Sequence, residues 1–188
     1  MMENIQEKLL FLYKFSRSPK QIGSLTPSSM FLAQKMLEPI NWSRVRHIAE
    51  LGAGTGAITK YIEEASMEHT KVLLFEKDAS LRNKLANRFP SYSCYADACQ
   101  LHEALRDGRI EHLDCILSGL PFFNFPQQMR DQLMDQIVTS LKPGGLFIAF
   151  QYSRQMRKQL CGLFEIECIR YVPWNIPPAF VYICRKRD

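Results

Sequence analysis

The sequence contains no hydrophobic run that approaches the ~20 apolar residues needed for a transmembrane helix. The longest apolar stretch near the N-terminus, from Leu9 to Tyr13, is too short for a secretory signal, and no small-residue cleavage site follows it. We therefore expect a cytoplasmic protein without a transmembrane segment.

Motifs for metal binding and redox chemistry are missing as well. The cysteines form no Cys-x-x-Cys pair, and no histidine lies at a spacing typical of a zinc site. Several cysteines lie inside apolar runs, where a thiol behaves as a small hydrophobic group. We predict no metal ion, and reduced thiols at Cys94, Cys99, Cys115, Cys161, Cys168 and Cys184.

A strong excess of charge of one sign is also absent, since the net charge is only +5 over 188 residues. The basic residues are unevenly distributed, with one cluster at 154–158 and another at 185–187. Such patches favour anionic partners, either nucleic acid or acidic lipid, although a solvated surface explains them equally well. A hydrophobic fraction of 46% is typical of a soluble globular chain with enough apolar material for one core.

What the sequence does have is a regular alternation of strand and helix patterns. Alternation of this kind indicates βαβ units and a parallel sheet. We expect strands at 45–51, 71–76, 92–96, 113–118 and 145–151, and helices at 56–66, 78–88, 98–106 and 127–141. The Lys142-Pro143-Gly144-Gly145 turn ends the last of these helices.

Both ends of the chain add to this pattern. A short basic helix at 153–161 precedes two extended runs, 164–172 and 179–185, whose short connector favours an antiparallel pair. Two helices, 3–16 and about 26–38, precede the first strand, and Pro27 suits the first position of the second. The prediction is one α/β domain over 1–188 with a seven-stranded sheet, five parallel strands plus a closing hairpin, and residues 1–38 as a helical membrane or substrate cap.

The most informative motif is the glycine-rich segment that follows the first strand. Glu50 precedes Gly52, Gly54 and Gly56, and Ala57 follows them. Glycine permits positive φ angles and a close approach of the backbone to a ligand. The spacing also satisfies the dinucleotide-binding fingerprint in its form ending in alanine, so the motif alone predicts a nucleotide-type cofactor without choosing its class.

Acidic residues lie at the ends of the next two strands, Glu76 as the last residue of one and Asp97 directly after the other. Glu76 lies where a carboxylate can accept hydrogen bonds from ribose hydroxyls, although Lys77 and the following helix also suit a plain surface carboxylate. Asp97, before Ala98, is positioned to bind an exocyclic amine of adenine, or else to cap a helix. The ends of parallel strands are where open α/β sheets bind ligands, which favours the ligand roles.

Together with a Leu120-Pro121-aromatic loop after the fourth strand, these motifs resemble the class I S-adenosylmethionine-dependent methyltransferases. The resemblance implies a Rossmann-like fold and S-adenosylmethionine as the cofactor. It implies that the glycine loop and Glu50 face the methionine moiety, that the strand end at Glu76 faces the ribose, and that the one at Asp97 faces the adenine. The implied cofactor residues are Glu50, Gly52, Ala53, Gly54, Gly56, Glu76, Lys77, Asp97, Ala98 and Ser118.

Three further segments resemble the small bacterial phospholipid N-methyltransferases, which methylate phosphatidylethanolamine stepwise toward phosphatidylcholine. They are 19–29, 118–121 and 175–179. The chain departs from that family at Ala53, where Gly-Pro-Gly is frequent, and at Trp174, where a basic residue is frequent. The resemblance implies methylation of a phosphatidylethanolamine-type lipid by a protein peripherally bound to the inner face of the cell membrane.

Methyl transfer needs mainly the positioning of an amine lone pair. We expect the carbonyls of Ser118 and Gly119 to orient the amine, Leu120 and Pro121 to form an apolar wall with Phe122, and Tyr152 to act as an orienting group. The aromatic residues 122, 123 and 125 suit either acyl-chain contact or the core. No histidine lies at a predicted strand end, so a histidine base is not expected.

The predicted helix 3–16 gives a clue to the identity of the methyl acceptor. It has more apolar residues than are needed to pack one face against the domain, which fits insertion into a membrane. A helix that packs as a lid over the cofactor site explains these residues equally well. Two other acceptor classes stay open. The 120–122 segment also resembles the loop of rRNA adenine dimethyltransferases, but the asparagine of those enzymes is missing at Ser118 and Gly119, and the chain ends at its last strand. A small-molecule methyltransferase is the other alternative.

Overall fold

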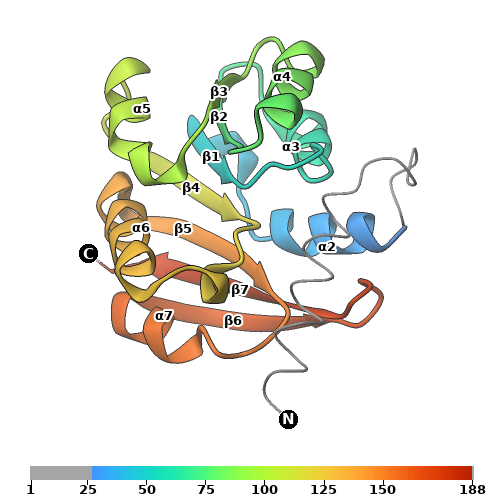
Figure 1. Cartoon of the computed structure of the whole chain (residues 1–188), viewed down its shortest axis with the longest axis vertical. Helices are drawn as coiled ribbons and strands as arrows, with labels where there is room; N and C mark the ends of the chain where they lie inside the picture. The colour runs from blue at the N-terminus through green and yellow to red at the C-terminus, as the bar shows by residue number, and fades with distance from the viewer. Residues whose placement is uncertain (1–26, 188) are drawn as a thin grey trace.

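The structure is a computed structural model that describes residues 27–187. Its centre is a seven-stranded sheet with the order β3-β2-β1-β4-β5-β7-β6 (Figure 1). The strands are β1 (His47–Leu51), β2 (Lys71–Phe75), β3 (Ser93–Tyr95), β4 (Leu113–Ser118), β5 (Leu141–Gln151), β6 (Phe164–Val172) and β7 (Ala179–Lys186). The α-helices are α2 (Pro27–Leu37), α3 (Thr59–Ala65), α4 (Ala79–Arg88), α5 (Leu101–Asp107), α6 (Gln127–Ser140) and α7 (Arg157–Leu163), and the 3-10 helices are η1 (Trp42–Arg44), η2 (Ala98–Gln100) and η3 (Phe122–Asn124).

The pairing confirms the predicted sheet. Strands β1 to β5 pair in parallel, whereas β7 is antiparallel to both β5 and β6. The chain builds β1, β2 and β3 outward in one direction and then returns to place β4 on the other side of β1. Ligands of open α/β sheets bind at such a reversal, outside the carboxyl ends of the strands. The end of β1 at Leu51 and the end of β4 at Ser118 are in register there.

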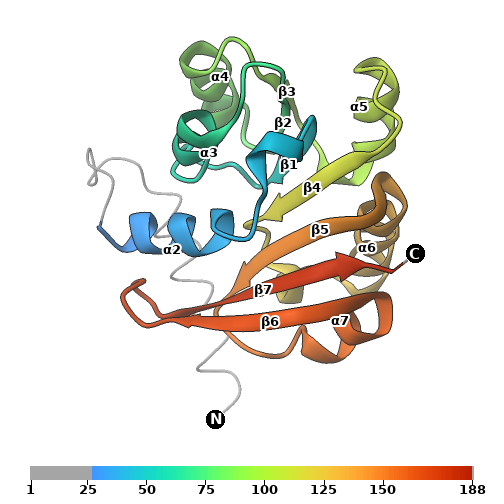
Figure 2. The same cartoon turned by 180° about the vertical axis from the view of Figure 1, so that it is seen from behind.

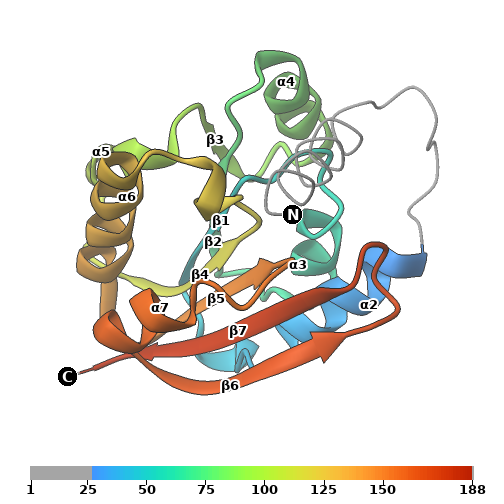
Figure 3. The same ribbon diagram turned by 60° about the horizontal axis from the view of Figure 1, so that its bottom comes forward.

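Helices cover both faces of the sheet, with α5, α6 and α7 on one side and α2, α3 and α4 on the other (Figure 3). Successive strand residues alternate between two apolar cores. In β4, Ile116 belongs to the core that contains Phe122 and Phe147, whereas Leu117 belongs to the core that contains Met36 and Phe89. Burial on both faces explains why the central strands are continuously apolar in the sequence.

Several element boundaries differ from the predictions. Helix α7 spans Arg157–Leu163 instead of 153–161, and β1 begins at His47 instead of residue 45. Helix α3 begins at Thr59 instead of residue 56, because Gly56 has φ +81° and is not helical. The predicted helix 98–106 is divided into η2 and α5, since Asp97 caps a separate 3-10 turn. Strand β5 begins at Leu141, which pairs with Leu113 before the register shifts around the predicted turn.

The structure describes the C-terminal hairpin in full, whereas at the N-terminus it describes the chain only from Pro27. The predicted helix 3–16 and most of the 19–29 segment lie outside the described residues. Helix α2 begins at Pro27, as predicted, and packs against the β6–β7 hairpin.

All six cysteines are free thiols. Within residues 27–187, no helix is both long enough and apolar enough to cross a membrane.

Candidate active site and family membership

The loop after β1 depends on glycine for its backbone conformation. Gly52, Gly54 and Gly56 have φ angles of +80°, +57° and +81°. Residues with a side chain rarely adopt this left-handed region, whereas glycine adopts it without steric cost. Three such angles within five residues fold the loop sharply between the end of β1 and the start of α3.

The three glycines face different surroundings. A Cβ atom at Gly56 would lie 3.0 Å from Cδ2 of Leu85 and 3.1 Å from Cε2 of Phe89, so this glycine lets the loop pack against α4 and the residue after it. A Cβ atom at Gly52 would lie 3.0 Å from Cδ2 of Leu120. Among the described residues 27–187, no atom lies within 4 Å of a Cβ atom placed at Gly54. These residues therefore leave space beside Gly54 that a ligand can occupy.

Backbone hydrogen bonds attach the glycine loop to the end of β2. The N–H groups of Gly52 and Ala53 both donate to the carbonyl oxygen of Phe75, at 2.8 Å and 3.0 Å. Ala53 is also buried in the core beneath the loop. The loop is thus held in shape by the protein itself, and little ordering is needed when a ligand binds.

Glu76 follows β2 directly and is only 8% exposed. Its Oε2 accepts a hydrogen bond from the N–H of Gly54 at 2.9 Å, and its Oε1 accepts one from the N–H of Asp78 at 2.8 Å. One carboxylate therefore links the glycine loop to the cap of α4. Each oxygen keeps a further lone pair, so the predicted ribose contact remains chemically feasible.

Glu50, the last residue but one of β1, lies beneath the loop. It is 2% exposed, and its Oε2 accepts a hydrogen bond from the Thr59 hydroxyl at 2.6 Å. Burial, reinforced by the nearby Glu76 carboxylate and opposed by the Thr59 bond, raises the pKa of Glu50 to about 8. Glu50 thus joins β1 to the first turn of α3 as a largely neutral acid near pH 7. Its predicted contact with the methionine moiety stays a prediction.

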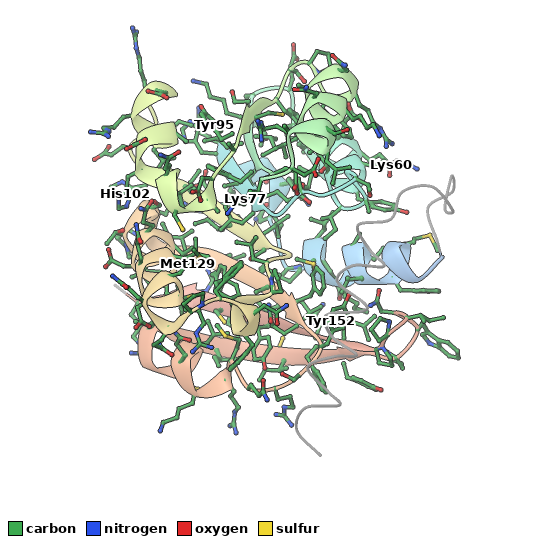
Figure 4. All side chains as sticks on the ribbon, viewed as in Figure 1. Lys60, Lys77, Tyr95, His102, Met129 and Tyr152 are labelled. Carbon is green, nitrogen blue, oxygen red and sulfur yellow. The ribbon has the colours of Figure 1, made fainter. Side chains whose placement is uncertain are left out.

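The residues expected near the adenine lie at the adjacent strand end. The N–H of Glu76 donates to the carbonyl of Tyr95 at 3.0 Å, which brings the ends of β2 and β3 together. Asp97 is exposed and caps η2, because its Oδ1 accepts from the N–H of Cys99 at 2.9 Å. Cap formation uses one oxygen and leaves the other available, so the ligand role of Asp97 and Ala98 stays a prediction. Lys77 is exposed and labelled in Figure 4.

The loop after β4 lies directly against the glycine loop. The N–H of Gly119 donates to the carbonyl of Leu51 at 2.9 Å, and a Cβ atom at Gly119 would lie 3.3 Å from the carbonyl oxygen of Gly52. Ser118 is fully buried, and its hydroxyl accepts from the N–H of Leu120 at 3.2 Å. The predicted acceptor loop is therefore in contact with the predicted cofactor loop.

Sequence reasoning missed Gln151, which is 8% exposed at the end of β5. Its Nε2 donates to the carbonyl of Leu120 at 2.8 Å and so holds the loop after β4 in place. The only signal in the sequence is a polar residue that ends the apolar run 146–150. A buried amide at such a position needs a hydrogen-bond partner, but the sequence does not say which one.

The aromatic residues near this edge separate into core and surface. Phe122 is fully buried, with ring contacts to Phe125 and Phe147, so it belongs to the core, and its part in the acceptor wall stays a prediction. Tyr152 is 38% exposed, and its ring meets that of Phe150 edge to face at 5.8 Å. Partial burial raises the pKa of the Tyr152 hydroxyl, which keeps its proton at neutral pH. Figure 4 shows Tyr152 near the β6–β7 hairpin.

Comparison with known families agrees with this geometry. Residues 49–149 match the family described as a methyltransferase domain, and the match includes the glycine loop and the ends of β2, β3 and β4. The chain belongs to the class I S-adenosylmethionine-dependent methyltransferases. This membership decides between the two cofactor classes that the glycine motif left open, and S-adenosylmethionine is the cofactor.

This methyltransferase is 33% identical over 190 residues to the ornithine lipid N-methyltransferase of Singulisphaera acidiphila, a match that covers 96% of the chain and 97% of the relative. Among solved structures, it is similar to the N-methyltransferase NodS from Bradyrhizobium japonicum WM9, with a TM-score of 0.72 and 14% identity over 87% of this chain and 98% of that one.

A second NodS structure, in complex with S-adenosyl-l-homocysteine, gives a TM-score of 0.68 at 14% identity and covers 85% of this chain and 86% of that one. The 1,6-didemethyltoxoflavin-N1-methyltransferase of Burkholderia thailandensis gives 0.66 at 15% identity over 98% of this chain and 88% of that one. At these identities the structural likeness establishes the methyltransferase fold, and it confirms the predicted fold class.

Proposed function

We propose that this methyltransferase transfers a methyl group to the primary amine of a membrane-lipid headgroup. The observation that carries this proposal is the 33% identity, over nearly the whole of both chains, to an ornithine lipid N-methyltransferase. Ornithine lipid is therefore the first acceptor to test. Phosphatidylethanolamine, which the sequence resemblance favours, also presents a primary amine and is the second.

The cofactor is assigned to the loops that meet at the ends of β1, β2 and β3. S-adenosylmethionine, when bound, supplies a methyl group on a positively charged sulfonium sulfur. The open side of Gly54 fits close approach of such a ligand to the backbone. We assign Glu76 to the ribose hydroxyls and Asp97 to the adenine amine, with Lys77 and Ala98 beside them and Ser118 on the methionine side.

The acceptor amine is assigned to the loop at 118–121 and to Tyr152. An amine attacks only through a free lone pair, so a lipid ammonium must first release a proton to solvent. The carbonyls of Ser118 and Gly119 are suited to accept hydrogen bonds from the remaining N–H groups. Tyr152, whose hydroxyl keeps its proton, can donate to or accept from the same amine. Transfer then forms a C–N bond and breaks the S–CH₃ bond.

We also propose that the chain works as one domain bound to the membrane surface, with residues 1–38 as a cap over the substrate. The inner face of the cell membrane is the location that fits a lipid acceptor best. Only the part of this cap formed by α2 is described, and it packs against the β6–β7 hairpin.

The test uses methyl-labelled S-adenosylmethionine and two sets of vesicles that differ only in whether ornithine lipid or phosphatidylethanolamine supplies the amine. Labelled lipid is separated by chromatography, and Gly54→Val serves as the matched inactive control. Label in either lipid with wild type alone supports the proposal and identifies the headgroup. A folded protein that binds S-adenosylhomocysteine yet labels neither lipid would overturn it, and label in rRNA instead would indicate a nucleic-acid methyltransferase.

A further inference from the structure

The tip of the β6–β7 hairpin exposes large apolar side chains. Tyr171, Trp174 and Ile176 are 56%, 72% and 85% exposed, and the last two are the most exposed large hydrophobic residues within residues 27–187. Single exposed apolar residues are common on protein surfaces. A group of three within six residues of one hairpin is different, because exposed apolar clusters mark sites of interaction.

The tip presents these side chains on a folded turn. Asn175 is 6% exposed, its N–H donates to the carbonyl of Val172, and its Nδ2 donates to the carbonyl of Pro177 at 2.6 Å. The polar residue of the tip is thus turned inward, while Trp174 and Ile176 on either side of it are exposed. Because the turn is already ordered, docking costs little additional backbone entropy.

The tip lies beyond the same edge of the sheet as the candidate active site. Phe180 pairs with Gln151 at the carboxyl end of β5, and Val172 pairs with Ala179, so the turn extends past the end of β5. Figure 2 shows the turn projecting beside α2. A surface that contacts the tip therefore faces the edge where Tyr152 and the loop after β4 lie.

The charge pattern favours a lipid surface as the partner. The stretch 171–180 contains no charged residue, so its insertion removes no charge from water. At its base, the Glu38 carboxylate is shared by Arg170 at 2.6 Å and Lys35 at 2.9 Å, which leaves two cations with one anion. Tryptophan and tyrosine are enriched at membrane–water interfaces, and nearby cations favour anionic lipid.

We propose that the β6–β7 tip is a membrane-contact element that inserts Trp174 and Ile176 into the headgroup region and so directs the active-site edge toward the bilayer. The inference rests on the proposed lipid substrate, and it adds a second membrane contact to the one predicted for the first helix. It also gives a role to Trp174, which stands where the resembled family often has a basic residue.

Fluorescence of Trp174 gives a direct test, because the chain has only two tryptophans. In a Trp42→Phe background, we expect a blue shift of emission and quenching by brominated acyl chains when vesicles of phosphatidylglycerol and phosphatidylethanolamine are added. The Trp174→Ser/Ile176→Ser double variant in an otherwise wild-type chain should bind these vesicles about 10- to 100-fold more weakly in sedimentation. Met67→Ser, at another exposed apolar residue, is the matched control and should bind like wild type.

Methyl transfer to the same lipid in vesicles and in detergent micelles separates the two proposals. The double variant should lose transfer to vesicles about tenfold and keep transfer to micelles, with unchanged affinity for S-adenosylhomocysteine. The membrane contact would be overturned if the emission of Trp174 did not change on addition of vesicles, or if it were already blue-shifted without them. Unchanged vesicle binding by the double variant would overturn it as well. Vesicle binding through Trp174 without labelled lipid from any preparation would instead overturn the proposed function and leave the contact standing.

Discussion

Replacing Gly54 and Gly56 by alanine should separate cofactor binding from folding. Both residues have positive φ, so alanine at either position costs about 1–2 kcal/mol in backbone strain. A new methyl group at Gly54 meets no atom of residues 27–187 within 4 Å, whereas one at Gly56 lies 3.0 Å from Leu85 and 3.1 Å from Phe89. Only the second change must displace core side chains.

The expected magnitudes follow from these contacts. Leu85 and Phe89 are 2% and 0% exposed, so overpacking at Gly56 adds about 1–3 kcal/mol to the strain. Gly56→Ala should therefore lower the free energy of unfolding by about 2–5 kcal/mol, and Gly54→Ala by about 1–2 kcal/mol. Affinity for S-adenosylhomocysteine should fall more in Gly54→Ala than in Gly56→Ala, because the methyl group at Gly54 occupies space assigned to the cofactor. For Gly54→Ala we expect at least about tenfold weaker binding, or about 1.4 kcal/mol.

Urea unfolding and calorimetric titration with S-adenosylhomocysteine measure the two quantities. Gly144→Ala is the matched control, because Gly144 also has positive φ, at +67°, and its Cβ position has no neighbour within 4 Å in the part of the chain that the structure describes, but it lies near the start of β5. It should reproduce the strain of Gly54→Ala and leave cofactor affinity unchanged. Wild-type affinity in Gly54→Ala, or a larger loss of stability there than in Gly56→Ala, would refute the assignment of the open side of Gly54 to the cofactor.

Two further predictions concern buried polar groups. Burial raises the pKa of Glu50 to about 8 from about 4.5, so its contribution to the free energy of unfolding is complete below about pH 4.5 and is lost as pH rises to about 8. In urea unfolding between pH 5 and 9, Glu50→Gln should reduce this loss of stability by up to about 4 kcal/mol. Equal pH dependence of stability in the variant and wild type would contradict the prediction. Gln151→Leu removes the hydrogen bond to the Leu120 carbonyl in the loop after β4. The methyl-transfer rate should therefore fall about tenfold, while affinity for S-adenosylhomocysteine stays within about twofold of wild type. An equal loss of affinity would assign the loop after β4 to the cofactor instead.

The fold was predictable because its signals are local and periodic. The apolar strands of the central sheet and the short connector between β6 and β7 carried enough information for sheet type and strand number. Boundaries were less certain where one residue overrides the pattern. Gly56 continues a helical pattern in the sequence, but its positive φ delays the start of α3 to Thr59.

The site was only partly predictable. The positions of Gly52, Gly54 and Glu76 at strand ends follow from the chain pattern, since parallel strands bring their carboxyl ends to one edge. The hydrogen bond from Gly54 to Glu76 spans 22 residues, and the one from Gln151 to Leu120 spans 31, so neither is visible in local sequence. The sequence left Phe122 open between acyl-chain contact and the core; its place in the core follows from η3, which turns it toward Phe147, a contact between distant segments.

By itself, the sequence determined the α/β sheet, the glycine turn and the acidic strand ends, because periodicity and backbone preference act over a few residues. Tertiary structure decided which glycine the described residues leave uncovered, that Glu50 is buried with a raised pKa, and that the exposed tip at Trp174 lies at the same sheet edge as the candidate active site. These properties depend on what other segments place around a residue. Burial, electrostatics and the direction of a surface arise only when strands far apart in the chain pair in one sheet.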